Sequence, residues 1–124
     1  MNPETPYRRP DRVAQQILEI IGEISTRNIN LKNFGFITFT KVQVTSDLKL
    51  AKVFYSVIEP KTEISAVTDH LNHMAGAFRK YLGPALKIKY TPELLFIHDE
   101  SLEYAQKINQ LFEDIHARDE ADDS

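Results

Sequence analysis

The stretch that decides the fold is LNHMAGAFRKYLG, at residues 71–83. It continues a helical pattern that opens at Thr62 and Glu63. The apolar residues of this pattern recur at three- and four-residue steps and form one stripe: Val67, Leu71, Met74, Ala75, Phe78 and Leu82. Gly76 lies inside the pattern, where a glycine costs about 1 kcal/mol relative to alanine. We therefore predict a long helical segment that is broken near Gly76 and ends at Gly83-Pro84.

A β-bulge is predicted in the strand at residues 34–45, FGFITFTKVQVT. This segment is rich in Phe, Thr, Val and Ile, which favour strands. Ile37 and Phe39 share one parity, whereas the two valines that follow them share the other. A bulge near Thr40–Lys41 would explain the switch, because one face of a regular strand cannot hold both pairs.

A second strand is predicted at residues 50–58, where Ala51, Val53, Tyr55 and Val57 alternate with other residues. Thr45-Ser46-Asp47 supplies side-chain oxygens for a turn before it. The short connection indicates an antiparallel hairpin.

The segment after the broken helix is predicted to be a third strand. Its apolar residues alternate, with Lys87 and Lys89 on the opposite face: Leu86, Ile88 and Tyr90. Leu94 to Ile97 continue the extended run. Pro92 cannot donate a ladder hydrogen bond, so we expect a bulge or an edge strand there.

Helices are predicted at both ends of the chain. The first, which Pro10 suits as a start, has one apolar stripe: Val13, Ile17, Ile20, Ile21 and Ile24. The last, which Ser101 can cap, carries these residues on one side: Leu102, Ala105, Ile108, Leu111, Phe112 and Ile115. The fold class is therefore α+β, with helices packed over one face of a small sheet. We expect one domain over residues 1–116 and a disordered acidic tail at 117–124.

The composition bounds the class of protein. The chain has 124 residues, no cysteine and a net charge of −3. Residues 112–124 hold six acidic residues and one arginine, which leaves 14 basic and 12 acidic residues in the rest. No apolar run approaches the ~20 residues that span a bilayer, and the polar start lacks the apolar core of a signal peptide. We expect a cytoplasmic monomer that needs no membrane and no cofactor.

Four segments resemble the ribosome-binding factor A family, whose members help to mature the bacterial small ribosomal subunit. They are RRPDRVAQQI at 8–17, TSDLKLAKVF at 45–54, LNHMAGAFRKYLG at 71–83 and KIKYTPELLFIHDES at 87–101. The resemblance implies a KH-like type II fold, a three-stranded sheet with the order α-β-β-α-kink-α-β-α. Ordinary KH domains clamp nucleotides with a GXXG loop. This family has an Ala-X-Gly kink instead, and here the three positions read Met74-Ala75-Gly76, so Met74 departs from the pattern.

The resemblance also implies a function. Its members bind the immature 30S subunit and its 16S rRNA, support maturation of the rRNA 5′ end, matter most in the cold and leave before translation. The residues expected to bind RNA are Arg8, Arg9, Arg12, Met74, Ala75, Gly76, Arg79, Lys80, Lys87 and Lys89. Arginine and lysine suit phosphate contacts. Equally, these cations are what solvated helix ends and a half-exposed strand would show, and Gly76 could be a packing glycine.

Two other functions are left open by the residues. The first is a metal-dependent hydrolase, whose active site could use His98, Asp99 and Glu103, although no phosphate loop or nucleophile accompanies them. Asp69, His70 and His73 lie within one helical turn but lack a further ligand. The third candidate is a protein-interaction module, in which a sheet edge or the acidic tail recruits an assembly GTPase.

Overall fold

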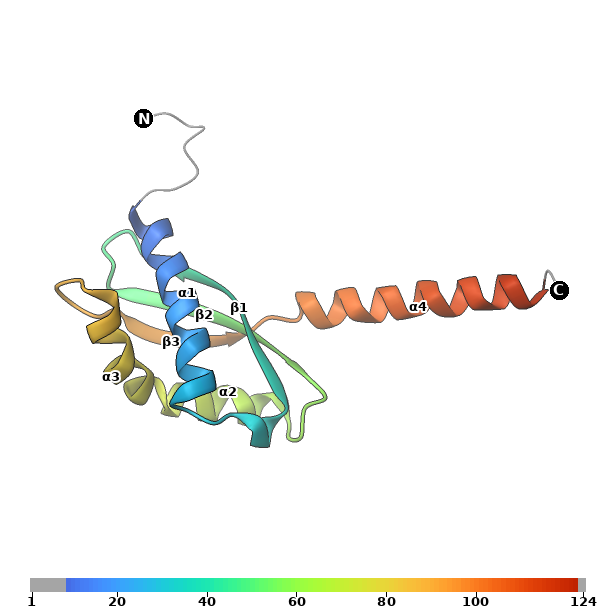
Figure 1. Ribbon diagram of the computed structural model, residues 1–124, viewed down its shortest axis with the longest axis horizontal. Helices are drawn as coiled ribbons and strands as arrows, with labels where there is room; N and C mark the ends of the chain where they lie inside the picture. Colours follow the sequence, from blue (N-terminus) through green and yellow to red (C-terminus); the bar gives the residue numbers. More distant parts are fainter. Residues whose placement is uncertain (1–8, 123–124) are drawn as a thin grey trace, which may run out of the picture.

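The computed structural model describes residues 9–122, except for the side chains of residues 102, 103, 105, 106 and 116–122 in the last helix. The elements, in chain order, are α1 (Arg9–Arg27), a 3-10 turn η1 (Lys32–Phe34), β1 (Phe36–Val44), β2 (Leu50–Ile58), α2 (Ile64–His73), α3 (Ala75–Leu86), β3 (Glu93–His98) and α4 (Ser101–Asp122). This order confirms the α+β class and the broken helix between the second and third strands (Figure 1).

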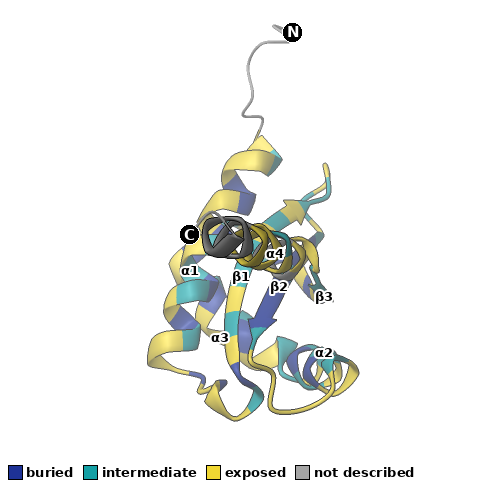
Figure 2. Cartoon of the chain, turned by 90° about the vertical axis from the view of Figure 1, so that its right-hand side faces the viewer, coloured by how far each residue is buried: buried dark blue, intermediate teal, exposed yellow. Residues whose placement is uncertain are grey.

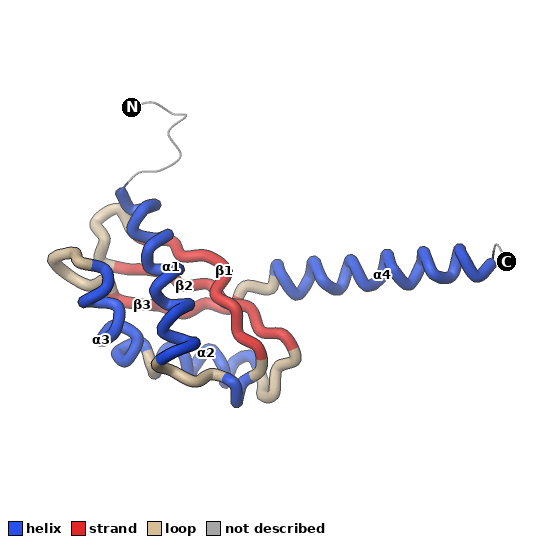
Figure 3. The backbone as a smooth tube through the Cα atoms, in the orientation of Figure 1, coloured by secondary structure: helices blue, strands red, loops and turns tan. Residues whose placement is uncertain are grey.

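The sheet has the order β1-β2-β3. β1 and β2 form the predicted antiparallel hairpin, whereas β2 and β3 run parallel. Parallel neighbours need a crossover connection, and α2 with α3 provides it. The helices α1, α2 and α3 cover one face of the sheet, and α4 extends away from it (Figure 3).

The predicted β-bulge is present. The β1–β2 register shifts between Phe39 and Lys41, so Thr40 is not paired with any residue of β2 in the register. Ile37, Phe39, Val42 and Val44 therefore all pack against the core. The bulge also frees the Thr40 side chain, which donates a hydrogen bond to Asp99 Oδ2 at 2.9 Å.

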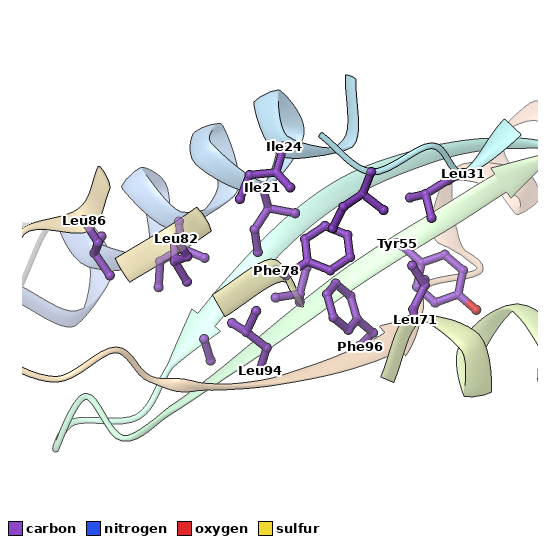
Figure 4. Packing of buried hydrophobic residues seen from close by; sticks show 14 of the residues in the cluster. Ile21, Ile24, Leu31, Tyr55, Leu71, Phe78, Leu82, Leu86, Leu94 and Phe96 are labelled. Atoms are coloured by element: carbon purple, nitrogen blue, oxygen red, sulfur yellow. The ribbon is translucent and has the colours of Figure 1, made fainter. Parts of the chain in front are cut away.

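The core lies between the sheet and the three covering helices. Phe39, Phe78 and Phe96 form an aromatic group in it, with ring centroids 5.1–6.2 Å apart. Ile21 and Ile24 of α1 lie above Phe78 (Figure 4). β2 is the most deeply buried strand, as its dark blue colour shows (Figure 2).

The predicted strand at Leu86–Tyr90 is wrong. α3 passes through Gly83 and Pro84 and ends at Leu86, and residues 88–90 form bends. Pro84 removes one helical hydrogen bond, but Leu82 and Leu86 are both buried on the core side of the helix. That burial outweighs the local preference for ending the helix, since tertiary packing overrides propensity.

The third strand begins only after Pro92. Its first N–H, that of Glu93, donates to the Lys49 carbonyl at 2.8 Å. β3 lies at the edge of the sheet, as the proline suggested.

Two side chains from the broken helix bind the backbone at β3. Asn72, at the end of α2, accepts from the Phe96 N–H at 2.8 Å and donates to the Phe96 carbonyl at 3.1 Å. Arg79, in α3, donates to the carbonyls of Thr91 and Pro92 at 2.9 and 3.0 Å. Both halves of the broken helix are therefore fixed to the same edge strand and the loop before it.

The last helix is less closely packed than we expected. Leu111, Phe112 and Ile115 are 57%, 66% and 52% exposed, so this part of the apolar stripe does not cover the body. The helix also continues to Asp122, through backbone that we expected to be irregular. Ala117, Arg118, Glu120 and Ala121 have no strong preference against helix, which explains the continuation. The division of the chain near residue 117 stays a prediction.

No helix in the part of the chain that the structure describes has both the length and the apolar content to cross a membrane.

Replacing Asn72 by alanine is expected to destabilise the domain by about 2–3 kcal/mol, because it leaves the Phe96 N–H and carbonyl without their partner. Urea unfolding followed by circular dichroism measures the loss. The neighbouring exposed residue provides the control, since His73→Ala should stay within ~0.5 kcal/mol of the parent. Equal effects of the two substitutions would contradict the anchoring role of Asn72.

Candidate nucleic-acid interface

The kink predicted from the sequence lies at Met74. This residue ends α2 and precedes α3, with φ −90° and ψ 5°. Its N–H donates back to the His70 and Leu71 carbonyls at 3.0 and 3.1 Å, and its carbonyl accepts from the Phe78 N–H at 3.1 Å. One residue therefore closes the first helix and opens the second.

Gly76 lies in the first turn of α3 and is exposed. A Cβ atom built at this position meets nothing within 4 Å. The packing interpretation of this glycine is therefore wrong: no neighbour requires the absence of a side chain. What the glycine does provide is exposed backbone without a side chain in the first turn of a helix, and helix N-termini in general favour anions.

Arg79 follows the kink by one turn, but its guanidinium already has partners within the protein. Besides the two carbonyl contacts, Nη1 lies 3.6 Å from Glu93 Oε1. The arginine is therefore a structural tie between α3 and the segment before β3. Its neighbour Lys80 is exposed, and no ion pair joins it to any side chain that the structure describes.

The remaining predicted cations lie at the far end of α3 from the kink. α1 and α3 run in opposite directions, since Phe78 lies beneath Ile21 and Ile24 whereas Leu86 lies towards the start of α1 (Figure 4). The exposed Arg9 and Arg12 at the start of α1 are thus at the same end as the exposed Lys87 and Lys89, which follow α3. Arg8 lies outside the described residues.

The predicted residues therefore form two groups rather than one patch. The kink group is Met74, Ala75 and Gly76, followed one turn later by Lys80. The loop-end group is Arg9, Arg12, Lys87 and Lys89. The kink and the loop-end group lie at opposite ends of α3, about 18 Å apart along this 12-residue helix.

Two exposed tyrosines lie beside these groups and were not among the predicted site residues. Tyr81 is 39% exposed and Tyr90 is 74% exposed. Tyr90 was placed on the buried side of a strand that does not exist, which is why its exposure was not foreseen. Periodicity alone gave no signal for Tyr81, because it lies on the helix beside buried Leu82.

Of the three residues proposed for hydrolysis, Asp99 makes structural hydrogen bonds just after β3. Asp99 Oδ1 accepts from the Ser101 hydroxyl at 2.6 Å and from its N–H at 3.0 Å. The hydrogen bond from the Ser101 hydroxyl is the main reason that the pKa of the Asp99 carboxyl lies below its ordinary value. The bonds from the Ser101 N–H and from Thr40 lower this pKa further. The Asp99 N–H donates to the Tyr55 carbonyl at 2.7 Å. The Glu103 side chain lies outside the described residues.

His70 has a structural surrounding. The half-buried ring of His70 lies 4.5 Å from that of Phe34. Among the side chains that the structure describes, no group of three or more histidines and carboxylates could hold a metal ion.

The fold and the exposed glycine at the kink define a KH-like domain of the type II order, in which a broken helix connects a hairpin to a parallel edge strand. The sequence model of the ribosome-binding factor A family matches residues 9–112. The chain belongs to that family.

Individual relatives agree with this assignment. The chain is 38% identical over 118 residues to ribosome-binding factor A of Trichlorobacter lovleyi, a match that covers 95% of this chain and 96% of the relative. It is 35% identical over 111 residues to that of Staphylococcus carnosus, with coverages of 90% and 96%. The crystal structure of ribosome-binding factor A from Thermus thermophilus superimposes with a TM-score of 0.63 at 15% identity. That match covers 74% of this chain and 97% of the other.

Replacing Gly76 by alanine is expected to stabilise the domain by roughly 0.5–1 kcal/mol, because alanine favours the helix and meets no neighbour. Thermal unfolding measures the change. Gly22, in the middle of α1, also has nothing within 4 Å of a built Cβ, so Gly22→Ala should behave alike. A lower melting temperature for Gly76→Ala would contradict the open surroundings of the kink.

Acid is expected to loosen the start of α4. The pKa of Asp99 is lower in the folded state than in the unfolded state. The carboxylate therefore stabilises the start of α4 fully at pH values above its unfolded pKa of about 4, and this stabilisation is lost as the pH falls through the lower folded pKa. NMR relaxation of the amides early in α4, recorded while the body stays folded, measures this. Asp99→Asn should remove the pH dependence. An unchanged acid response in that variant would show that another group is responsible.

Proposed function

We propose that this protein is a non-catalytic assembly factor that binds the 16S rRNA of the immature small ribosomal subunit through the kink between α2 and α3. The observation that carries the proposal is Gly76: its exposed backbone begins a helix, and no packing contact requires the glycine. A backbone that must approach RNA closely would require it. Membership of the ribosome-binding factor A family supports the choice of ribosomal RNA over other anions.

A related structure supports the choice of subunit. The fold superimposes with a TM-score of 0.52, at 14% identity, on a homology model of Thermus thermophilus ribosome-binding factor A that was fitted into the cryo-EM map of a 30S complex. That protein's place on the 30S subunit is what we propose for this chain.

The kink group would receive the RNA backbone. The first N–H groups of α3 favour a phosphate by hydrogen bonding and by the helix dipole. Lys80 adds a full positive charge one turn further on, and the half-buried side chain of Met74 packs against the core at the kink. These contacts fix a strand in position without reading its sequence.

Binding of this kind is sufficient for an assembly role. A protein that binds one rRNA conformer better than another shifts the population towards it and needs no chemical step. We propose that the conformer held is the one from which the rRNA 5′ end matures late in assembly, in the cytoplasm. The requirement would be strongest in the cold, where misfolded RNA pairs separate slowly. The structural use of Asp99 supports a non-enzymatic function.

A specific observation also favours a protein partner. The exposed Leu111, Phe112 and Ile115 give α4 an apolar side that the body leaves uncovered. We propose that this helix recruits a second assembly factor, for which a GTPase is the candidate. Deleting residues 117–124 should leave rRNA binding intact, and loss of rRNA binding in that variant would contradict the separate roles.

The RNA site is tested by binding of labelled protein to free small subunits at low salt. Gly76→Ala and Lys80→Glu should each weaken binding, by roughly tenfold for the charge reversal. Gly76→Ala is informative because the same substitution should stabilise the fold. Lys107→Glu reverses an exposed charge on α4 and is the matched control, expected to bind as the parent does. Wild-type binding by both kink variants would overturn the proposal.

A further inference from the structure

The loop that joins α3 to β3, residues 87–92, is held firmly although it has no regular structure. Lys87 ends the helix in the left-handed region, with φ 56°. Arg79 binds the carbonyls of Thr91 and Pro92. A Cβ built on Gly83 would lie 3.0 Å from Thr91 Oγ1, so the loop folds back closely over α3. Ile88 packs against the core from within the loop.

These anchors leave three side chains facing solvent. Tyr90 is 74% exposed, the largest exposed fraction among the large hydrophobic side chains that the structure describes. Lys87 and Lys89 are also exposed, and the Lys89 ammonium lies 5.3 Å from the centre of the Tyr90 ring. An aromatic ring and two cations thus share one fixed loop.

We propose that this loop is a stacking platform for an unpaired RNA base, with Tyr90 as the ring and Arg79 as the residue that positions it. The inference rests on the proposed function, because it assumes that RNA is the ligand. It adds the class of nucleotide recognised: single-stranded, with its base free to stack. Lys87 and Lys89 bind the phosphates on either side.

The chemistry of the loop favours a base over a duplex. An exposed ring on a rigid support loses little conformational entropy on binding and offers a face that any unpaired base can cover. A base-paired duplex hides those faces, so its phosphates would contact the lysines but no base would stack on Tyr90.

The contacts of Arg79 assign it to positioning rather than to phosphate binding. Nε and Nη2 donate to backbone carbonyls, and Nη1 lies 3.6 Å from Glu93 Oε1. A phosphate would have to compete with these partners. The loop would lose its attachment to α3 if it succeeded.

The proposed stacking on the Tyr90 ring is tested by measuring the affinity of labelled variants for free small subunits. Tyr90→Leu should bind roughly tenfold more weakly, whereas Tyr90→Phe keeps the ring and should bind nearly as the parent does. The matched control is Tyr104→Leu, since Tyr104 is 67% exposed on α4 and should have no effect. Equal affinities of Tyr90→Leu and Tyr104→Leu would overturn the platform.

The design separates this inference from the proposed function. If the parent protein fails to bind small subunits at low salt, both fail. If the parent binds and Gly76→Ala and Lys80→Glu weaken binding but Tyr90→Leu does not, only the platform is wrong.

The role of Arg79 is tested by the dependence of affinity on salt. Arg79→Gln should weaken binding without changing the salt slope and should add little to Tyr90→Leu in the double variant. Lys89→Gln removes a phosphate contact and should lower the slope by about 0.7, the value for one phosphate of a single strand. A similar drop for Arg79→Gln would overturn its positioning role.

Discussion

The side-chain amide of Asn72 holds the structure in the arrangement on which its other features depend. It binds both backbone groups of Phe96, as a neighbouring strand would, and so covers part of the edge of β3. Asn72 lies two residues before the break in the helix. The end of α2 is therefore fixed to the sheet at the point where the chain turns into α3, and the position of the kink is set by that attachment.

Arg79 provides the second attachment, one turn after the kink. The two polar residues thus fasten the helices on either side of Met74 to one edge strand and the loop before it. Phe78 fills the space between these attachments and is fully buried against Phe96. A rigid kink is suited to binding, because little flexibility remains to be lost when a ligand arrives.

The predictable parts of the fold were those set by burial along one element. The change of parity after Phe39 required a bulge, because only a bulge lets both pairs of side chains reach the core. The strand expected at Leu86–Tyr90 failed for a related reason. Leu86 and Ile88 are both directed to the core, but one ends a helix and the other lies in a loop, and alternation alone cannot separate these cases.

The candidate site was less predictable because its polar residues depend on tertiary partners. Arg79 was predicted to be a phosphate ligand because its actual partners could not be recognised in the sequence. The carbonyls that it binds lie 12 and 13 residues further along the chain. Asn72 was overlooked because its partner, Phe96, is 24 residues away. Gly76 and Lys80 do lie near the break in the helix, because a break in periodicity is a local signal, and their role in RNA binding stays a prediction.

The kink group and the loop-end group lie towards opposite ends of α3, and we propose that the distance between them bears on RNA binding. An RNA that contacts both the kink and the α3–β3 loop must follow α3 for about 18 Å. A conformer whose strand is extended and unpaired over that distance gains both sets of contacts, whereas a conformer folded back into a duplex gains one. A ligand shifts an equilibrium only by its difference in affinity for the two states, so if both groups bind RNA as we propose, the span of α3 sets how strongly one conformer is favoured. A short patch of equal charge would bind RNA as tightly and select between conformers less well.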